Sequence, residues 1–327
     1  MESYASLIQL LNKHIEEHSA HFKSMSPANM YQPMGYILDL GGKRVRPLLT
    51  LIACDLFNGT IQHALPSAMA VELFHNFSLI HDDILDKAPL RRANPTVHEK
   101  WNTDIAILSG DGMLVKAYDV LAQSQQQHIG YLLPLFSKTG MEVCEGQQMD
   151  MDFETQEKVS VEAYIQMITY KTAVLLGCSL QMGAICANTS YQTQQHVYEF
   201  GKHIGIAFQL LDDVLDVFAE NKNFGKQIGG DIIANKKTYL LLKALELANP
   251  DQLQQLQALC QMPNSLKDEK VKQVTALYLA LNVKELALNE ANKHTSIALQ
   301  HLQEIEADEV KKDHLKAFAL QLLNRNK

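Results

Sequence analysis

The chain has 327 residues, of which 46% are hydrophobic and 20% are charged, and its formal net charge is −8. This composition is typical of soluble globular proteins, and the length allows a large buried core. An acidic chain with a pI near 5.9 is not expected to bind nucleic acid or an anionic membrane surface.

The five cysteines form no C-x-x-C pair, and their number is odd. They imply neither a disulfide framework nor a zinc site, and a reducing cytoplasm is the expected compartment. The amino terminus has the pattern of an amphipathic helix rather than of a signal peptide. The longest apolar stretch, residues 173–187, is interrupted by glycines and polar residues. We therefore predict no transmembrane segment.

Helical periodicity dominates the chain, and no convincing alternating strand appears. The only proline between Thr96 and Asn249 is Pro134, so long helices can run uninterrupted there. In chain order, helices are predicted over residues 2–23, 28–39, 45–57, 66–87, 103–128, 131–153, 161–187, 192–220, 231–248, 251–261, 267–304 and 308–325. We predict a single all-α domain over residues 1–327, a large helical bundle with a central active-site cavity.

Two copies of one acidic motif end apolar helical runs: Asp82-Asp83-Ile84-Leu85-Asp86 and Asp212-Asp213-Val214-Leu215-Asp216. Residues four apart share a helix face, so the first and last aspartates of each motif converge. Clustered carboxylates suit Mg²⁺, which completes its shell with substrate phosphates. One copy alone would equally fit a solvated helix end. Two copies in apolar surroundings favour a metal-bridged diphosphate site between two helices.

A second cluster is basic and runs Gly41-Gly42-Lys43-Arg44-Val45-Arg46-Pro47. The glycines allow close approach of the backbone to a ligand, and three cations within four residues can grip a phosphate. Arg91 and Arg92 follow the first acidic motif. Each piece alone has an ordinary alternative, namely a basic surface turn or arginines that neutralise an acidic helix end.

Taken together, these segments resemble the trans-isoprenyl diphosphate synthase (polyprenyl synthetase) family. The matching pieces, in the family's order and spacing, are GGKRVRP at 41–47, ELFHNFSLIHDDILDKAPLRR at 72–92, GQQMD at 146–150, YKTA at 170–173, FQLLDDVLD at 208–216 and FGKQIGGDIIANKKTY at 224–239. The resemblance implies the isoprenoid synthase helical bundle. It also implies a magnesium-dependent, head-to-tail condensation of isopentenyl diphosphate with dimethylallyl, geranyl or farnesyl diphosphate, in a homodimer.

The resemblance implies roles residue by residue. The site for isopentenyl diphosphate matches Gly42, Lys43, Arg46, His75 and Arg92. The metal ligands match Asp82, Asp86 and Asp212, supported by Asp83, Asp213 and Asp216, for three Mg²⁺ ions with Mn²⁺ as a substitute. Cations on the allylic diphosphate match Arg91, Lys171, Lys226 and Lys236, and polar groups facing the allylic carbon match Thr172 and Gln209. The sequence leaves open whether Lys236 or Lys237 faces the site.

Several of these assignments rest on the resemblance alone. A single histidine such as His75 is more often packed than functional, and a lysine that begins an apolar helix, such as Lys171, commonly snorkels to the surface. The basic end of the chain is also assigned by resemblance. Arg325 and Lys327 are predicted to fold over bound isopentenyl diphosphate.

Product length is indicated by the residues before the first acidic motif. Phe77 precedes Asp82 by five residues, which is roughly 7–8 Å along a helix axis. In the family an aromatic side chain here acts as a floor for the growing product, and Phe74 lies one turn further down. Ser78 is small, and the motif has no two-residue insertion. The combination resembles geranylgeranyl (C20) synthases more than farnesyl (C15) synthases.

Two rival functions fit less well. A terpene cyclase would share the helical fold and one acidic motif but would lack the second motif and the basic turn. A non-catalytic partner subunit would tend to lose its acidic motifs, and here every expected carboxylate is present. One departure from the family is Asn102, which replaces an expected glycine before residues 106–111 and is predicted to affect a turn only.

Overall fold

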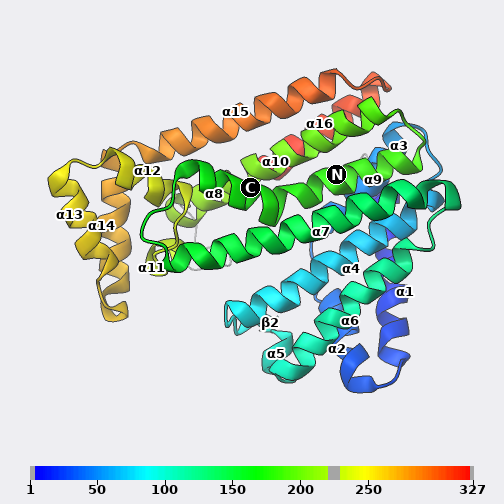
Figure 1. The fold of residues 1–327 in the computed structure, drawn as a ribbon, viewed down its shortest axis with the longest axis horizontal. Coiled ribbons are helices and arrows are strands. Elements are labelled where there is room, and N and C mark those ends of the chain that lie inside the picture. Colours follow the sequence, from blue (N-terminus) through cyan, green and yellow to red (C-terminus); the bar gives the residue numbers. More distant parts are fainter. Residues whose placement is uncertain (1–3, 220–228, 325–327) are drawn as a thin grey trace. The chain divides into compact units, whose positions relative to one another are not determined.

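The structure is a computed structural model, and it describes residues 4–219 and 229–324 (Figure 1). The chain divides into two compact units. Unit 1 comprises Met1–Gly140, Leu175–Tyr198 and Glu304–Phe318, and unit 2 comprises Met141–Val174, Glu199–Gln303 and Ala319–Lys327. The predicted residues Lys226, Arg325 and Lys327 lie outside the described ranges.

Unit 1 is built around the long helix α4 (Ile61–Leu85). Its side chains are buried on all sides between Ala64 and Phe74, as expected of a helix that is apolar all round. Helices α3 and α6 pack against it, and α2 packs against both α1 and α6. The other elements wholly within this unit are α1 (Ala5–Ser24), α2 (Ala28–Asp39), α3 (Val45–Leu56), β1 (Leu90–Arg91), β2 (Asn94–Pro95), α5 (Val97–Lys100) and α6 (Thr103–Leu121).

Unit 2 has its own apolar core, which includes Tyr164, Leu210, Leu240 and Tyr278. Helix α12 lies against α8, α14 and α15, and α14 also contacts α11 and α13. The elements wholly within this unit are α8 (Val161–Ile168), η2 (Thr169–Ala173), α11 (Gly230–Ile233), α12 (Tyr239–Leu247), α13 (Pro250–Cys260), η4 (Asn264–Leu266), α14 (Lys267–Ala280) and α15 (Val283–Gln303). Helices α7 (Gln126–Thr155), α9 (Val174–Cys186), α10 (Tyr191–Phe218) and α16 (Glu309–Leu323) have residues in both units.

The predicted all-α class is confirmed, and the only strands in the described part are the two-residue pair β1 and β2. Several predicted helix boundaries are wrong. The helix predicted over 267–304 is broken at Asn282, which adopts the left-handed conformation at φ 57°. The helix predicted over 231–248 is likewise two helices, with left-handed Asn235 between them. The one predicted over 103–128 ends at Leu121.

Helix α4 also begins five residues earlier than predicted, because Pro66 lies within it instead of at its start. Burial of Ala64 and Leu65 favours this longer helix over the intrinsic cost of an internal proline. The departure from the family at Asn102 has a local explanation. Its Oδ1 atom accepts a hydrogen bond from the Ile105 backbone N–H at 2.8 Å, so the residue caps the start of α6.

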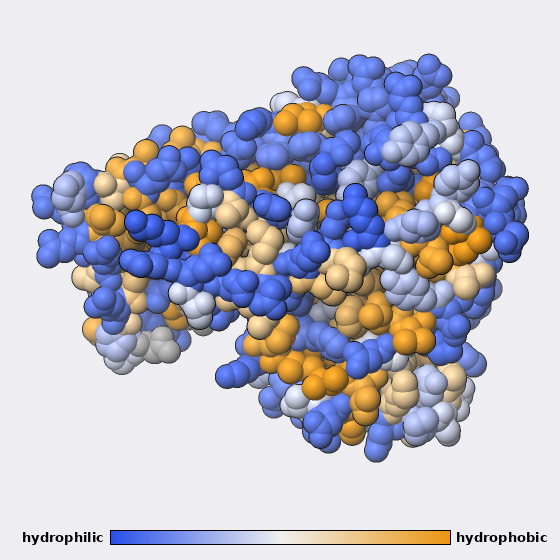
Figure 2. All heavy atoms as spheres, in the orientation of Figure 1, coloured by the Kyte–Doolittle hydropathy of each residue, from blue (hydrophilic) through white to orange (hydrophobic). Residues whose placement is uncertain are grey.

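No helix in the described ranges is both long and apolar enough to cross a membrane. Hydrophobic residues nevertheless reach the surface over α6, where orange atoms gather among the blue ones in Figure 2. The exposed fractions are 61% for Leu108 and 64% for Val115. These two residues are seven apart and therefore share one face of α6.

Candidate active site

The first acidic motif ends α4 and presents its aspartates in different directions. Asp83 is buried, and both of its carboxylate oxygens accept hydrogen bonds from Arg91, each at 2.8 Å. Asp82 is half-buried and Asp86 is exposed. The motif therefore combines one inward anchor with two carboxylates nearer to solvent.

The basic turn before α3 is held by its middle arginine. Gly41 and Gly42 have φ of 74° and 128°, a region that favours glycine, and Arg44 is also left-handed at 48°. The Arg44 guanidinium donates to the Leu38 carbonyl and pairs with Glu72, whose side chain is only 1% exposed. Arg44 is thus bound to interior groups and supports the turn from within.

Arg92 reaches this turn from the β1–β2 hairpin. Its guanidinium donates to the Gly41 carbonyl oxygen. A Cβ atom added to Gly42 would lie only 2.7 Å from the Arg92 guanidinium, so a side chain there would displace this contact, and the φ of 128° itself favours glycine. The hairpin turn itself uses left-handed Arg92 and Ala93. Two segments about fifty residues apart in the chain thereby share one cationic surface.

His75 lies among arginines. Arg46 Nη1 donates to His75 Nε2 at 3.3 Å. Burial, reinforced by the positive charges of Arg46, Arg92, Arg91 and Arg44, holds the pKa of His75 well below its ordinary value. The imidazole is therefore neutral, and its Nε2 accepts the hydrogen bond from Arg46.

The cluster is rich in arginine. The positive charges of Arg44, Arg46, Arg91 and Arg92 all reach His75, and two of these arginines pair with buried carboxylates, Arg44 with Glu72 and Arg91 with Asp83. Arginine forks suit the oxygens of a diphosphate. Of the residues predicted for isopentenyl diphosphate, unit 1 therefore brings together Gly42, Arg46, His75 and Arg92, and Lys43 follows Gly42 in the same turn.

The predicted chain-length residues lie on α4 below the acidic motif. Phe77 is 9% exposed, and its ring centroid lies 5.5 Å from that of Phe74 and 4.8 Å from that of His81. Phe74 packs further against Phe136. The Ser78 hydroxyl donates to the His75 carbonyl at 2.8 Å, so this small side chain is turned back onto its own helix.

In unit 2, Lys171 and Thr172 lie on the π-helical segment η2. A Cβ atom added to Gly146 on α7 would lie 2.3 Å from the Lys171 backbone nitrogen, and one on Gly205 would lie 2.6 Å from the Ala173 Cα. Two glycines thus let α7 and α10 approach this segment closely. Single π-turns in helices frequently mark functional sites, because they redirect side chains.

Lys171 and Lys236 converge on one carboxylate. The Asp150 Oδ2 atom lies 2.6 Å from Lys171 Nζ and 3.6 Å from Lys236 Nζ. Burial alone would raise the pKa of Asp150, but Lys236 and Lys171 together hold it below its ordinary value. Lys237 instead donates to the carbonyls of residues 153 and 156 at the end of α7. Of the two lysines, Lys236 is therefore the one that joins Lys171 at Asp150.

The second acidic motif has the same division as the first. Asp213 is buried and accepts hydrogen bonds from the Tyr164 hydroxyl and, at 3.3 Å, from the Gln209 amide. Burial raises the pKa of Asp213 to about 7. Asp212 is half-buried, and Asp216 accepts the Asp231 backbone N–H at 3.0 Å at the start of α11. Thr172 donates to Gln209 at 3.3 Å and so joins the same network.

The carboxylates of each motif, taken within its own unit, are donors that suit magnesium. Asp82 and Asp86 lie in or beside the last turn of α4, and Asp212 lies near the end of α10. A helix carries partial negative charge at its carboxyl end, so carboxylates placed there are unfavourable unless a cation accompanies them. Hard oxygen donors in such a position match the ligands that Mg²⁺ prefers.

Three residues of these clusters were missed by the sequence reasoning. Glu72, Asp150 and Tyr164 pair with Arg44, Lys171 and Asp213, respectively. The available signals were a carboxylate inside an apolar helix, for Glu72, and the last residue of the GQQMD segment, for Asp150. Tyr164 carried no sequence signal that distinguished it from a packed aromatic.

Comparison with known proteins gives one consistent family. A family model described as polyprenyl synthetase matches residues 27–278. A protein of Methanosarcina mazei named geranylgeranyl diphosphate synthase is 40% identical over 222 residues, or 67% of this chain and 68% of that protein. One of the same name from Saccharolobus solfataricus is 36% identical over 88% of this chain and 85% of its own length.

A solved structure extends the similarity to nearly the whole chain. A crystal structure described as geranylgeranyl pyrophosphate synthase superposes with a TM-score of 0.91 at 42% sequence identity. The match covers 98% of this chain and 99% of that one.

The environment of His75 predicts a pH dependence of stability. An unfolded histidine has a pKa of about 6.5, whereas the folded residue stays neutral to much lower pH. Below that value only the unfolded chain gains the proton, so stability is full above about pH 6.5 and falls as the pH is lowered. Between pH 7.5 and 5.5 the wild type should lose up to about 1.4 kcal/mol more than His75→Gln, as measured by urea unfolding without substrate. Equal losses in the two proteins would contradict this environment for His75.

Proposed function

We propose that geranylgeranyl diphosphate (C20) is the product of this chain, which belongs to the polyprenyl synthetase family and is a prenyltransferase. The observation that carries the product assignment is the similarity, over 98% of the chain, to a structure described as geranylgeranyl pyrophosphate synthase. The alternative product is farnesyl diphosphate (C15). Incubation with isopentenyl diphosphate, a labelled allylic primer and magnesium, followed by chromatography of the chain lengths, decides between them.

The reaction joins an allylic diphosphate to isopentenyl diphosphate. The allylic carbon–oxygen bond breaks, the double bond of isopentenyl diphosphate forms the new carbon–carbon bond, and pyrophosphate and one proton leave. Lys171 and Lys236 are proposed to hold the allylic diphosphate, and Thr172 and Gln209 to face the allylic carbon. Magnesium held by Asp82, Asp86 and Asp212 would neutralise charge on the departing pyrophosphate. Lys226 is assigned to the allylic diphosphate by the sequence resemblance alone.

The two diphosphates make different demands on the protein. The diphosphate of isopentenyl diphosphate does not react, so it needs only a fixed grip, and the cationic cluster of unit 1 can supply one through Lys43, Arg46 and Arg92. The allylic diphosphate becomes the leaving group, so its charge grows during the reaction. For Arg91 we propose a positioning role, because its fork already holds Asp83.

The metal and the compartment are further parts of the proposal. We propose three Mg²⁺ ions per active site and replacement by Mn²⁺, which titration of activity with each metal would test. The cytoplasm is the proposed compartment, supported by five cysteines that are all free thiols. Recovery of the activity from cell fractions would test that assignment.

The same Asp-to-Asn substitution should affect different properties at two neighbouring positions of the first motif, turnover at Asp82 and stability at Asp83. Asp82→Asn should lower turnover roughly a thousandfold or more with little change in stability, because it removes a metal ligand needed in the transition state. Asp83→Asn should lower the free energy of unfolding by about 1.5–3 kcal/mol, because it weakens a buried, charge-assisted pair. Asp313→Ala, an exposed carboxylate on α16, is the control for both measurements. Full activity in Asp82→Asn would contradict the ligand assignment.

Substrate assignment is tested by a crossed pair of substitutions. Arg46→Ala should raise KM for isopentenyl diphosphate at least tenfold more than KM for the allylic primer, at about 1.4 kcal/mol per tenfold change. Lys171→Ala should do the reverse. Steady-state kinetics with each substrate varied in turn gives both constants. Equal effects on the two substrates would show that the division of cations is wrong.

We also propose that the chain forms a homodimer through α6. Leu108 and Val115 expose a hydrophobic surface on one face of this helix, and such patches commonly mark protein interfaces. Leu108→Glu with Val115→Glu should convert a dimer into a monomer of 36.7 kDa in light scattering. Leu279→Glu, an equally exposed leucine on α14, should leave the dimer intact. A monomeric wild type at micromolar concentration would refute the dimer.

Product length is predicted to depend on Phe77 and Ser78. Phe77→Ala should shift products beyond C20, because the floor below the metal ligands is removed, and Ser78→Phe should shorten them towards C15. If Phe77 only packs the core, its loss should instead destabilise the protein by about 3–5 kcal/mol and leave the products unchanged. Product chromatography and melting temperatures of both variants distinguish these outcomes.

A further inference from the structure

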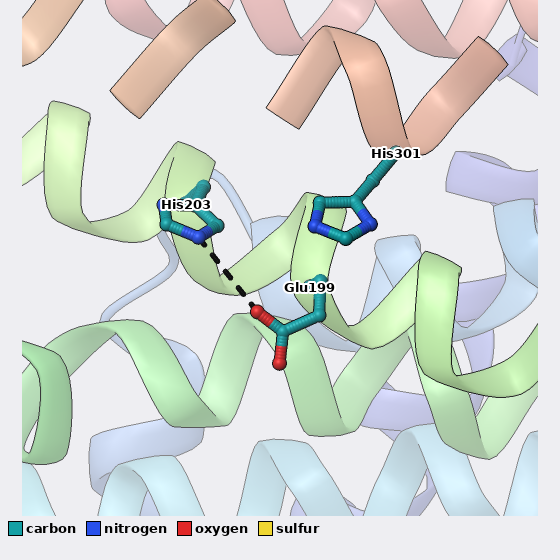
Figure 3. Close-up of side chains that lie close together, drawn as sticks. All are labelled: Glu199, His203 and His301. Atoms are coloured by element: carbon teal, nitrogen blue, oxygen red, sulfur yellow. Dashed lines mark ion pairs between the residues drawn. The ribbon is translucent and has the colours of Figure 1, made fainter. Parts of the chain in front are cut away.

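A cluster of histidines and glutamates in unit 2 has no part in the proposed reaction. Figure 3 shows Glu199 and His203 projecting from α10 towards His301 on α15. One potential ligand atom from each of the three residues lies within 4.8 Å of the others. Residues 199 and 301 are about a hundred positions apart, so this grouping is produced by the packing of the two helices.

The spacing on α10 suits chelation. Glu199 and His203 are four residues apart, so both face the same side of the helix one turn from each other. Two ligands at this spacing, with a third from another segment, are the arrangement that His₂Glu zinc sites use. Imidazole nitrogens select zinc and similar transition metals over magnesium.

A hydrogen-bonded chain sets the orientation of His203. Its Nδ1 lies 2.7 Å from Nδ1 of His294, and Nε2 of His294 lies 3.5 Å from a Glu290 oxygen. A proton on Nε2 of His294 facing Glu290 leaves its Nδ1 as the acceptor, so His203 donates through Nδ1. The lone pair on His203 Nε2 is then directed towards Glu199, 3.7 Å away. Metal-binding histidines generally donate their other ring N–H in this way.

The surroundings are compatible with an ion. Burial lowers the pKa of His203 to about 4, so its ring is neutral near pH 7. The His203 ring stacks on those of His294 and His301 at centroid distances of 5.0 and 6.2 Å, which fixes its plane. Lys202 competes for the carboxylate, because its Nζ lies 2.6 Å from Glu199 Oε2. Such a partly exposed pair contributes at most about 1 kcal/mol, so an ion can displace it.

We propose that Glu199, His203 and His301 form a binding site for a transition-metal ion of the zinc class, separate from the magnesium of the reaction. His203 precedes Asp212 by nine residues, which at 100° per residue places the two on opposite sides of α10. An ion bound here would connect α10 to α15 and stabilise unit 2, because it binds only the folded arrangement. Glu290 and His294 are positioning residues for this site.

The test uses the untagged full chain, stripped of metal with a chelator and kept in excess Mg²⁺. Titration with Co²⁺, followed by its visible absorption, and with Zn²⁺ against a chromophoric chelator should give one ion per chain. His301→Ala and Glu199→Gln should each weaken binding about a hundredfold or more, and Glu290→Gln about tenfold. Zn²⁺ should raise the melting temperature of the wild type but not of His301→Ala, and His301→Ala should retain prenyltransferase activity.

The control is a pair of histidines with the same four-residue spacing as Glu199 and His203. His14 and His18 on α1 each direct Nδ1 to a backbone carbonyl one turn earlier, at 3.0 and 2.8 Å. The double substitution His14→Ala and His18→Ala should keep wild-type affinity for Co²⁺. No saturable binding by the wild type, or equal affinity in His301→Ala when its metal-free circular dichroism matches the wild type, would overturn the proposal. Because His301→Ala and Glu199→Gln are tested separately, the result does not depend on one variant that could misfold.

Discussion

The hydrogen-bonded ion pair between Asp83 and Arg91 is the interaction on which the unit 1 part of the candidate active site depends. Both oxygens of a buried carboxylate are held by one guanidinium, so the end of α4 cannot rotate without breaking two charge-assisted hydrogen bonds. Fixing Asp83 inward leaves Asp82 and Asp86 closer to solvent, because they lie on other faces of the same helix turn.

The same pair also positions the basic residues. Arg91 ends β1 and Arg92 begins the left-handed turn of the hairpin, so the two consecutive side chains reach different partners. Once Arg91 is bound to Asp83, Arg92 is directed to the Gly41 carbonyl and covers Gly42. One buried ion pair therefore orders the end of α4, which carries the proposed metal ligands, and the arginine that contacts the basic turn.

Unit 2 also has a buried middle aspartate held by hydrogen bonds, but this carboxyl group is a weaker acid. The middle aspartate of its motif, Asp213, is tied to the Tyr164 hydroxyl rather than to an arginine, and burial raises its pKa to about 7. A neutral donor offsets less of the cost of burying a carboxylate than a cation does. In both motifs the central carboxylate serves as an anchor, which the sequence pattern DDxxD does not distinguish from a ligand.

The fold class and the position of both acidic motifs on helices were predictable, because helix periodicity and carboxylate spacing are local properties of the sequence. The partners of buried charges were not, because Glu72 meets Arg44 across 28 residues and Tyr164 meets Asp213 across 49. The break at Asn282 was missed for another reason. A single asparagine in the left-handed conformation ends a helix without changing the apolar periodicity on either side.

The predominance of arginine in the unit 1 cluster and of lysine in the unit 2 cluster follows from the proposed chemistry. Arginine forks on the unreactive diphosphate provide directional hydrogen bonds to a group whose charge does not change. Lysine is a compact charge with freely rotating donors, better suited to a leaving group whose charge grows as the bond breaks. Lys171 and Lys236 both pair with Asp150. Its negative charge offsets the repulsion between the two lysines and keeps both oriented before the substrate binds. Removing Asp150 would therefore disorder the cations rather than strengthen their grip.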